Sequence, residues 1–212
     1  MNGLLLLFAA VDLMLLLWTF KDKEPAAARL WLLRFLLLGM LYDNLLQGVG
    51  NWFIEASWYA AANVPRFILH ALVLPFLTLY GLSVMRSAGV TLAGNHFFSG
   101  FCWLFTACAL VWGFYHEVIL LELGPKSVFG VSKLGSVSGM PPVATILTNI
   151  LVLPMAAAVW RVAGWPWFFL GALFIFLVNG ATGGQPWGFL VGNFAEVVFV
   201  VSLLQTHWRF AR

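Results

Sequence analysis

Residues 3–20 read GLLLLFAAVDLMLLLWTF, a run of apolar side chains that a single carboxylate, Asp12, interrupts. A helix needs roughly 20 apolar residues to cross the hydrocarbon layer of a bilayer. A secretory signal peptide would carry basic residues before such a run and a small-residue cleavage pattern after it, and neither is found here. We therefore expect residues 3–20 to form a membrane-spanning helix that stays in the protein.

The composition of the whole chain agrees with this first run. Of the 212 residues, 62% are hydrophobic and 9% are charged, and the mean hydropathy is +0.95. These values lie far outside the range of soluble globular domains. The net charge is +3, but the basic residues are spread over short connections and form no patch of the kind that binds nucleic acid. We expect an integral membrane protein with membrane lipids, and no nucleic acid, among its partners.

Seven segments are apolar enough, and approximately long enough, to cross a bilayer. They cover residues 3–20, 30–51, 64–85, 96–122, 142–162, 166–182 and 188–208. Arg161, Gly164 and Pro166 form a very short turn between the fifth and sixth segments, and a six-crossing alternative would require that turn to be re-entrant. The sequence contains no soluble domain and no evident internal repeat. We predict one all-α domain over residues 1–212, folded as a seven-transmembrane helix bundle.

The positions of basic residues predict the orientation of this bundle, because cytoplasmic loops carry an excess of Lys and Arg. One side collects most of them: Lys21, Lys23, Arg29, Arg34, Arg86, Arg161, Arg209 and Arg212. The other side has only Arg66, Lys126 and Lys133, of which the last two belong to a Gly- and Ser-rich connection over residues 124–142. We predict that the N-terminus lies outside a cell membrane and the C-terminus in the cytoplasm.

Ionisable side chains inside apolar segments are the main indication of function. A charge at the bilayer centre costs roughly 2.5–3.5 kcal/mol on insertion scales, so such groups normally face a partner or a wet cavity. With this orientation and a rise of about 1.5 Å per residue, these side chains fall in the outer half of the membrane: Asp12, Asp43, Arg66, His70, His116, Glu117 and Glu196. We expect them to line one cavity that is open toward the outside.

The spacing of these residues suggests two kinds of site. Arg66 and His70 lie four residues apart and share a face of the third helix. His70 and His116 are expected at similar depths on antiparallel helices, an arrangement that suits two ligands of one divalent metal or haem. The tentative metal ligands are His70, His116 and Glu117. Simpler alternatives are that Arg66 extends to the headgroups and that Asp12 is a protonated acid bonded to another helix.

The first functional hypothesis is an enzyme that acts on a lipid or isoprenoid entering from the outer leaflet. Asp43, His70 and Glu196 would supply acid and base groups, with Arg66 and Asp12 also assigned to the catalytic set. Common soluble-enzyme motifs such as HExxH, GxSxG and a glycine-rich phosphate loop are missing from the sequence. Two alternatives remain open: a haem- or pigment-binding subunit that joins other membrane subunits in a larger complex, and a proton-coupled transporter of a small solute.

Overall fold

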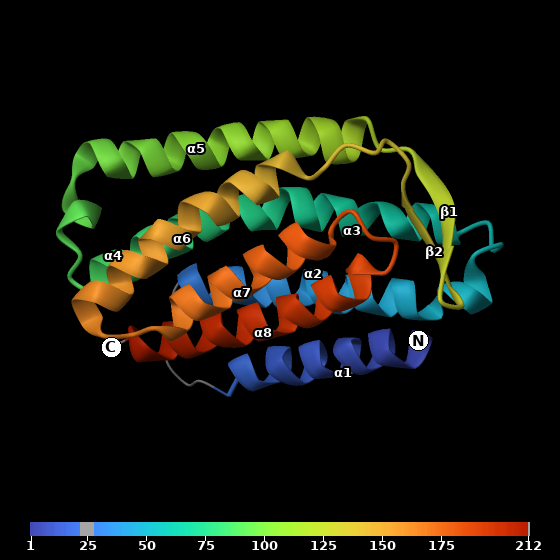
Figure 1. Ribbon diagram of the computed structural model, residues 1–212, viewed down its shortest axis with the longest axis horizontal. Helices are drawn as coiled ribbons and strands as arrows, with labels where there is room; N and C mark the ends of the chain where they lie inside the picture. The colour runs from blue at the N-terminus through green and yellow to red at the C-terminus, as the bar shows by residue number, and fades with distance from the viewer. Residues whose placement is uncertain (22–27, 212) are drawn as a thin grey trace.

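Helices make up most of the structure, a computed structural model that describes residues 1–21 and 28–211 (Figure 1). The helices are α1 (Asn2–Thr19), α2 (Ala28–Phe53), α3 (Tyr59–Val73), α4 (Leu77–Ser87), α5 (His96–Phe114), α6 (Val143–Ala163), α7 (Trp167–Thr182) and α8 (Gly188–Arg209). Short 3-10 turns, η1 (Leu74–Phe76) and η2 (Thr91–Gly94), flank α4, and a π-helical turn, η3 (Tyr115–Ile119), ends α5. With α3 and α4 counted together, successive helices run in alternating directions, and the two termini lie at opposite ends of the long axis (Figure 1).

The expected apolar segments correspond to these helices. Six helices of the described residues are long and apolar enough to cross a membrane, with α3, η1 and α4 counted as one continuous span. The remaining helix, α7, is apolar but has only 16 residues. Helix α3 begins at Tyr59, earlier than expected, so Pro65 lies inside it and not in its first turn. Pro75 interrupts the long span, because proline removes a hydrogen bond and crowds the preceding turn.

The two halves of the bundle differ in chemistry. The half nearer the C-terminus contains the main apolar core, to which α2, α4, α6, α7 and α8 all contribute. Leu37, Tyr80 and Leu203 are at most 2% exposed there, and the Tyr80 hydroxyl donates to the Leu203 carbonyl oxygen at 2.6 Å. This packed half is closed. Both ion pairs between helices and the buried Asp12–Asn44–Asn193 hydrogen bonds occur in the half nearer the N-terminus.

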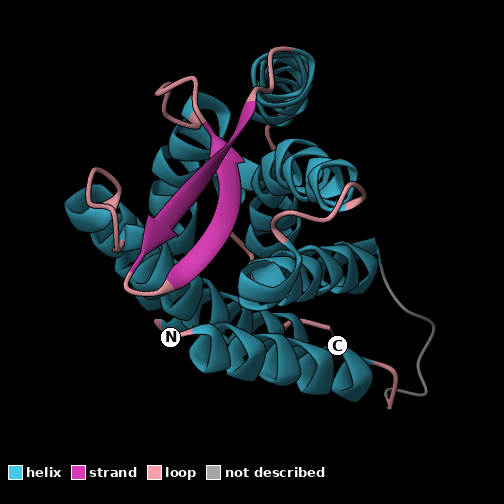
Figure 2. Cartoon of the chain, turned by 90° about the vertical axis from the view of Figure 1, so that its right-hand side faces the viewer, coloured by secondary structure: helices cyan, strands magenta, loops and turns pink. Residues whose placement is uncertain are grey.

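A β-hairpin covers the end of that polar half (Figure 2). Strands β1 (Leu123–Val128) and β2 (Val131–Ser136) pair antiparallel. They lie in the Gly- and Ser-rich connection, for which the sequence predicted no strands. The Asn51 side chain fastens β2 to the end of α2: its amide donates to the Gly130 carbonyl oxygen at 2.6 Å, and its oxygen accepts from the Ser132 amide at 2.5 Å. The hairpin is thereby held against the bundle.

Close packing between the hairpin and α2 requires glycine at position 50. A Cβ added there would run into the Ser132 carbonyl oxygen and the Tyr59 hydroxyl. We expect Gly50→Ala to lower the free energy of unfolding by about 1–3 kcal/mol, the usual cost of overpacking. Reversible unfolding in mixed micelles measures this. Gly100→Ala is the matched control, because nothing lies within 4 Å of a Cβ at that helical position; equal effects of the two substitutions would contradict the prediction.

The α2–α3 and α7–α8 hairpins repeat the same turn, which the sequence did not reveal. The Ile54 amide donates to the Gly50 carbonyl oxygen at 2.9 Å, and the Gly183 amide donates to the Asn179 carbonyl oxygen at 2.8 Å. The next two hydrogen bonds also correspond: Ala56 to Phe53 and Tyr59 to Ala56 in the first hairpin, Gln185 to Thr182 and Gly188 to Gln185 in the second. Across this turn the two sequences share only the tryptophan that precedes the second helix, so the repeat lies in the backbone.

Candidate active site

An ion pair joins Asp43 on α2 to Arg66 on α3. Arg66 Nε lies 2.7 Å from Asp43 Oδ1, and the two side chains are 8% and 28% exposed, with Arg66 the more buried. Arg66 Nη1 also donates to Asn63 Oδ1 at 2.6 Å and to the Leu134 carbonyl oxygen at 3.0 Å. The other Asp43 oxygen accepts from the Gln47 amide. Arg66 therefore pairs with an acid inside the protein.

A second pair joins His70 on α3 to Glu117 on the π-helical turn η3. His70 Nδ1 lies 2.7 Å from Glu117 Oε2, and the side chains are 35% and 15% exposed. No described residue forms a hydrogen bond with His70 Nε2, which leaves this nitrogen for another molecule. Single π-helical turns re-aim side chains and often occur at functional sites. The pair has the geometry of a carboxylate that orients an imidazole for proton transfer.

Asp12 takes part in a third contact chain, which links three helices. The Asn44 amide on α2 donates to Asp12 Oδ2 on α1 at 2.9 Å, and the Asn193 amide on α8 donates to Asn44 Oδ1 at 2.7 Å. Asp12 and Asn44 are 0% exposed. Asp12 Oδ1 has no hydrogen-bond partner among the described residues. This arrangement is the one expected of an acid that bonds across helices, so Asp12 connects α1 to the rest of the site.

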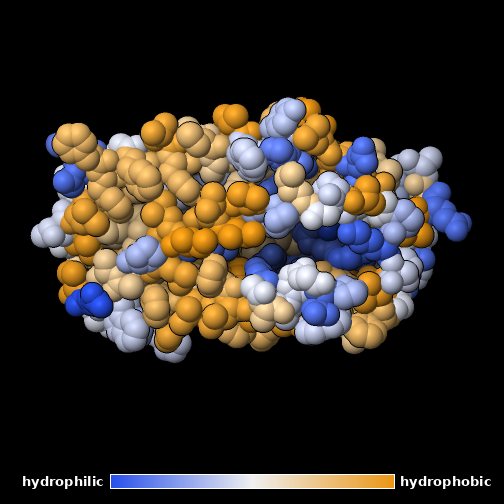
Figure 3. All heavy atoms as spheres, turned by 45° about the horizontal axis from the view of Figure 1, so that its top comes forward, coloured by the Kyte–Doolittle hydropathy of each residue, from blue (hydrophilic) through white to orange (hydrophobic). Residues whose placement is uncertain are grey.

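Glu196 lies one helical turn after Asn193 on α8 and faces the same set of charges. Its carboxyl interacts electrostatically with those of Asp43 and Asp12, with His70 and with Arg66. No described residue donates a hydrogen bond to it. A hydrophilic hollow opens between apolar surfaces toward the hairpin end of the molecule (Figure 3). The structure thus brings six of the predicted residues within electrostatic or hydrogen-bonding reach of one another: Asp12, Asp43, Arg66, His70, Glu117 and Glu196.

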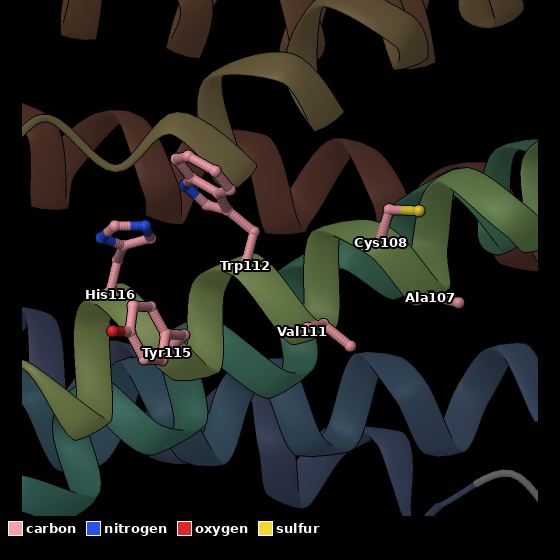
Figure 4. A pocket seen from close by; sticks show the side chains of 6 residues that line it. All are labelled: Ala107, Cys108, Val111, Trp112, Tyr115 and His116. Atoms are coloured by element: carbon pink, nitrogen blue, oxygen red, sulfur yellow. The ribbon is translucent and has the colours of Figure 1, made fainter.

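His116 lies apart from these residues. It stacks on Trp112, with ring centroids 4.3 Å apart, and lines a groove of about 540 Å³ on the outer face of α5 and η3 (Figure 4). Its neighbour Glu117 turns toward His70, because adjacent helical residues point about 100° apart. Among the described residues, no group of three or more His, Cys, Asp and Glu side chains could hold a metal ion. The three tentative metal ligands are therefore not gathered around one point.

Two polar residues of the site were not singled out from the sequence, although helical spacing could have found them. Gln47 lies four residues after Asp43, and Asn63 lies three residues before Arg66, so each pair shares a helix face. A third residue, Lys133, had no such signal. It comes from β2 and reaches the site only because the hairpin folds over the helix ends, where its Nζ donates to Gln47 Oε1 at 2.7 Å.

The surroundings of Lys133 lower the pKa of its amine to about 7. The main cause is burial, to which the positive charges of Arg66 and Lys126 add, while the Asp43 carboxylate acts in the opposite direction. The Nζ atom also lies 3.3 Å from the centre of the Phe189 ring, a contact that favours the ammonium form. Near neutral pH, Lys133 is consequently divided between its charged and uncharged forms.

Stability should rise with pH above 7 because of Lys133. In the unfolded chain the amine keeps its proton up to about pH 10.4, whereas in the folded protein it loses the proton near pH 7. The unfolded state therefore binds more protons across this window, and folding gains free energy as the pH increases. Thermal unfolding between pH 6 and 9 should show an upward slope that is smaller in Lys133→Gln. A variant with an unchanged slope would contradict this assignment.

No protein-family model matches the chain, and no curated protein or solved structure is significantly similar to it.

Proposed function

We propose that this chain is a membrane-embedded enzyme that performs acid–base chemistry on a lipid or isoprenoid. One observation carries the proposal: two ion pairs from different helices, Arg66–Asp43 and His70–Glu117, lie within electrostatic reach of Glu196. Charged groups in membrane helices are costly, and they mark substrate or ion pathways when they persist. A site that is open at one end and closed by apolar packing at the other suits a reaction chamber.

In this proposal His70 and Glu196 are the two proton carriers. Glu117 holds the imidazole through Nδ1, so Nε2 can accept a proton from the substrate. Glu196 has a carboxyl without a hydrogen-bond donor among the described residues, and it returns a proton at a second substrate atom. Asp43 has both oxygens engaged by Arg66 and Gln47, so it acts as a positioning residue that keeps a positive charge beside the reacting groups.

We also propose seven crossings of a cell membrane, with the hairpin end outside. The described cations near the opposite end support this orientation, since they outnumber those of the hairpin end: Lys21, Arg29, Arg34, Arg86, Arg161 and Arg209. Lys23 and Arg212, predicted on this side from the sequence, lie outside the described residues. Exposed tryptophans near helix ends support the same placement: Trp18, Trp31, Trp52, Trp58, Trp160 and Trp187. The 16-residue α7 crosses with help from its flanking turns.

Lipid conversion by the purified protein tests the proposed function. The full chain is reconstituted into liposomes that contain a total membrane lipid extract supplemented with polyprenols, and the lipids are followed by mass spectrometry against protein-free liposomes. We expect at least one lipid species to be depleted and a product of related mass, or an isomer with a different retention time, to accumulate. An unchanged lipid profile across extracts from several sources would contradict the enzyme assignment.

The repeated α2–α3 and α7–α8 turns favour one second candidate, a proton-coupled transporter of a small solute. Many transporters contain two structurally similar repeats, with the binding site between them. Here α2 and α8, one from each hairpin, are joined by the Asn44–Asn193 hydrogen bond. Solute uptake into proteoliposomes that depends on a pH gradient, and that is lost in Glu196→Gln, would favour transport over catalysis.

A further inference from the structure

The β-hairpin brings positive charges together at the entrance of the site. Lys126 on β1 and Lys133 on β2 are direct cross-strand partners, and like charges in such positions destabilise a hairpin. Arg66 lies beneath the same strands, where it donates to the Leu134 carbonyl oxygen at 3.0 Å. Both Arg66 and Lys126 interact electrostatically with Lys133. Without a bound anion, this arrangement of cations lowers the stability of the folded protein.

The described carboxylates only partly neutralise these cations. Asp43 is the one described carboxylate whose charge acts on Lys133, and its two oxygens are already occupied by Arg66 and Gln47. Neither Lys126 nor Lys133 forms an ion pair with a described carboxylate. An anion from outside the chain would relieve the repulsion, and phosphate is the group that clustered Lys and Arg side chains commonly bind.

An apolar groove of about 630 Å³ borders the cations on the side of α1 and α8, a volume typical of ligand sites. It is lined by residues of α1, the hairpin tip and the start of α8: Met1, Leu4, Phe8, Phe129, Trp187, Leu190, Val191 and Phe194. Lys133 Nζ lies 3.3 Å from the ring centre of Phe189, the residue before Leu190. Lys133 therefore contacts α8 at the residue next to the groove lining.

The hairpin tip carries a residue that the turn itself disfavours. Phe129 has φ 50° and Gly130 has φ 75°, so both central residues of the two-residue loop are left-handed. Asn or Asp followed by Gly normally occupies this turn, and a left-handed Phe costs roughly 1–2 kcal/mol. Phe129 is 63% exposed and lines the groove. Such strain is retained where the side chain has another use, here contact with an apolar ligand.

We propose that Lys126 and Lys133 bind the phosphate of an anionic amphiphile whose hydrocarbon chain lies in the groove between α1, α8 and the hairpin tip. Arg66 adds positive potential from below. This inference rests on the proposed function and narrows its substrate class to phosphate-bearing lipids or isoprenoids. The headgroup would then lie at the entrance of the site that contains Glu196 and His70.

Calorimetry on the detergent-purified full chain tests the inference. The three ligands, each titrated separately, are short-chain phosphatidic acid, diacylglycerol of the same chain length, and inorganic phosphate. We expect phosphatidic acid to bind, Lys133→Gln to weaken it about tenfold, or 1.4 kcal/mol at 25 °C, and Phe129→Asn to weaken it while the fold is kept. Lys126→Gln, at an exposed position, should act in the same direction. Lys21→Gln removes one cation at the opposite end and should bind as the unaltered protein does.

Three results would overturn the inference: equal binding of diacylglycerol, binding of inorganic phosphate as tight as that of phosphatidic acid, or equal losses in Lys133→Gln and Lys21→Gln. The second would assign the site to free phosphate. Glu196→Gln separates this inference from the proposed function, because it should bind phosphatidic acid normally. If phosphatidic acid binds but no lipid is converted, the binding inference stands and the enzyme assignment is contradicted. If only neutral lipids are converted, the enzyme assignment stands and the binding inference is contradicted.

Discussion

Glu196→Gln is expected to lower the rate of lipid conversion by about 10²- to 10⁴-fold, the usual contribution of a positioned acid or base. The substitution keeps the size and polarity of the side chain but removes its ability to transfer a proton. No described residue donates a hydrogen bond to this carboxyl, so the substitution breaks no hydrogen bond of the fold. The initial rate of product formation in proteoliposomes measures the effect.

The matched control for this experiment is Glu55→Gln. Glu55 is an exposed carboxylate in the turn between α2 and α3, and its removal changes the net charge by the same amount. We expect this variant to convert lipids at the unaltered rate. If Glu196→Gln retained full activity, or if Glu55→Gln were equally impaired, Glu196 would not be a proton carrier.

Arg66→Met is expected to destabilise the protein by about 3–5 kcal/mol, the range observed when one partner of a buried ion pair is removed. The change leaves the Asp43 carboxylate without its cation and deprives Asn63 Oδ1 and the Leu134 carbonyl oxygen of their donor. The linear side chain of Met approximately fills the space of the arginine stem. Reversible unfolding in mixed micelles measures the loss.

A double-mutant cycle distinguishes the ion pair from simple packing. Asp43→Asn in the Arg66→Met background removes the uncompensated charge, so the double variant should be more stable than the sum of the two single effects predicts. Arg34→Met is the control. Arg34 is also buried and donates to the Thr19 carbonyl oxygen, but it lies at the other end of α2. Its effect should therefore be additive with that of Asp43→Asn. Strict additivity of Arg66→Met and Asp43→Asn would show that the pair contributes no coupling energy.

Hydrophobic composition and segment length are by themselves enough to determine the helical class of this protein. A run such as residues 3–20 can satisfy its backbone in an apolar environment only as a helix, so its boundaries follow from composition. The break at Pro75 and the left-handed Gly164 between α6 and α7 are also predictable, because they depend on single residues. Through the constant rise per residue, depth along each helix predicts Asp43, His70 and Glu196 in the same half of the bundle.

Tertiary structure alone decided which of these residues meet. Depth is set by position in the chain, but the direction of a side chain around the bundle depends on helix rotation, which sequence spacing leaves undetermined. The π-helical turn η3 rotates Glu117 toward His70 and leaves His116 on the outer groove. Lys133 reaches the site through a hairpin whose strands are too short and too polar to be recognised. The two repeated helix turns have the same backbone hydrogen-bond pattern but almost no residue identities in common. Main-chain atoms form these bonds, and every sequence has the same main chain, so residue identity does not reveal the repeat.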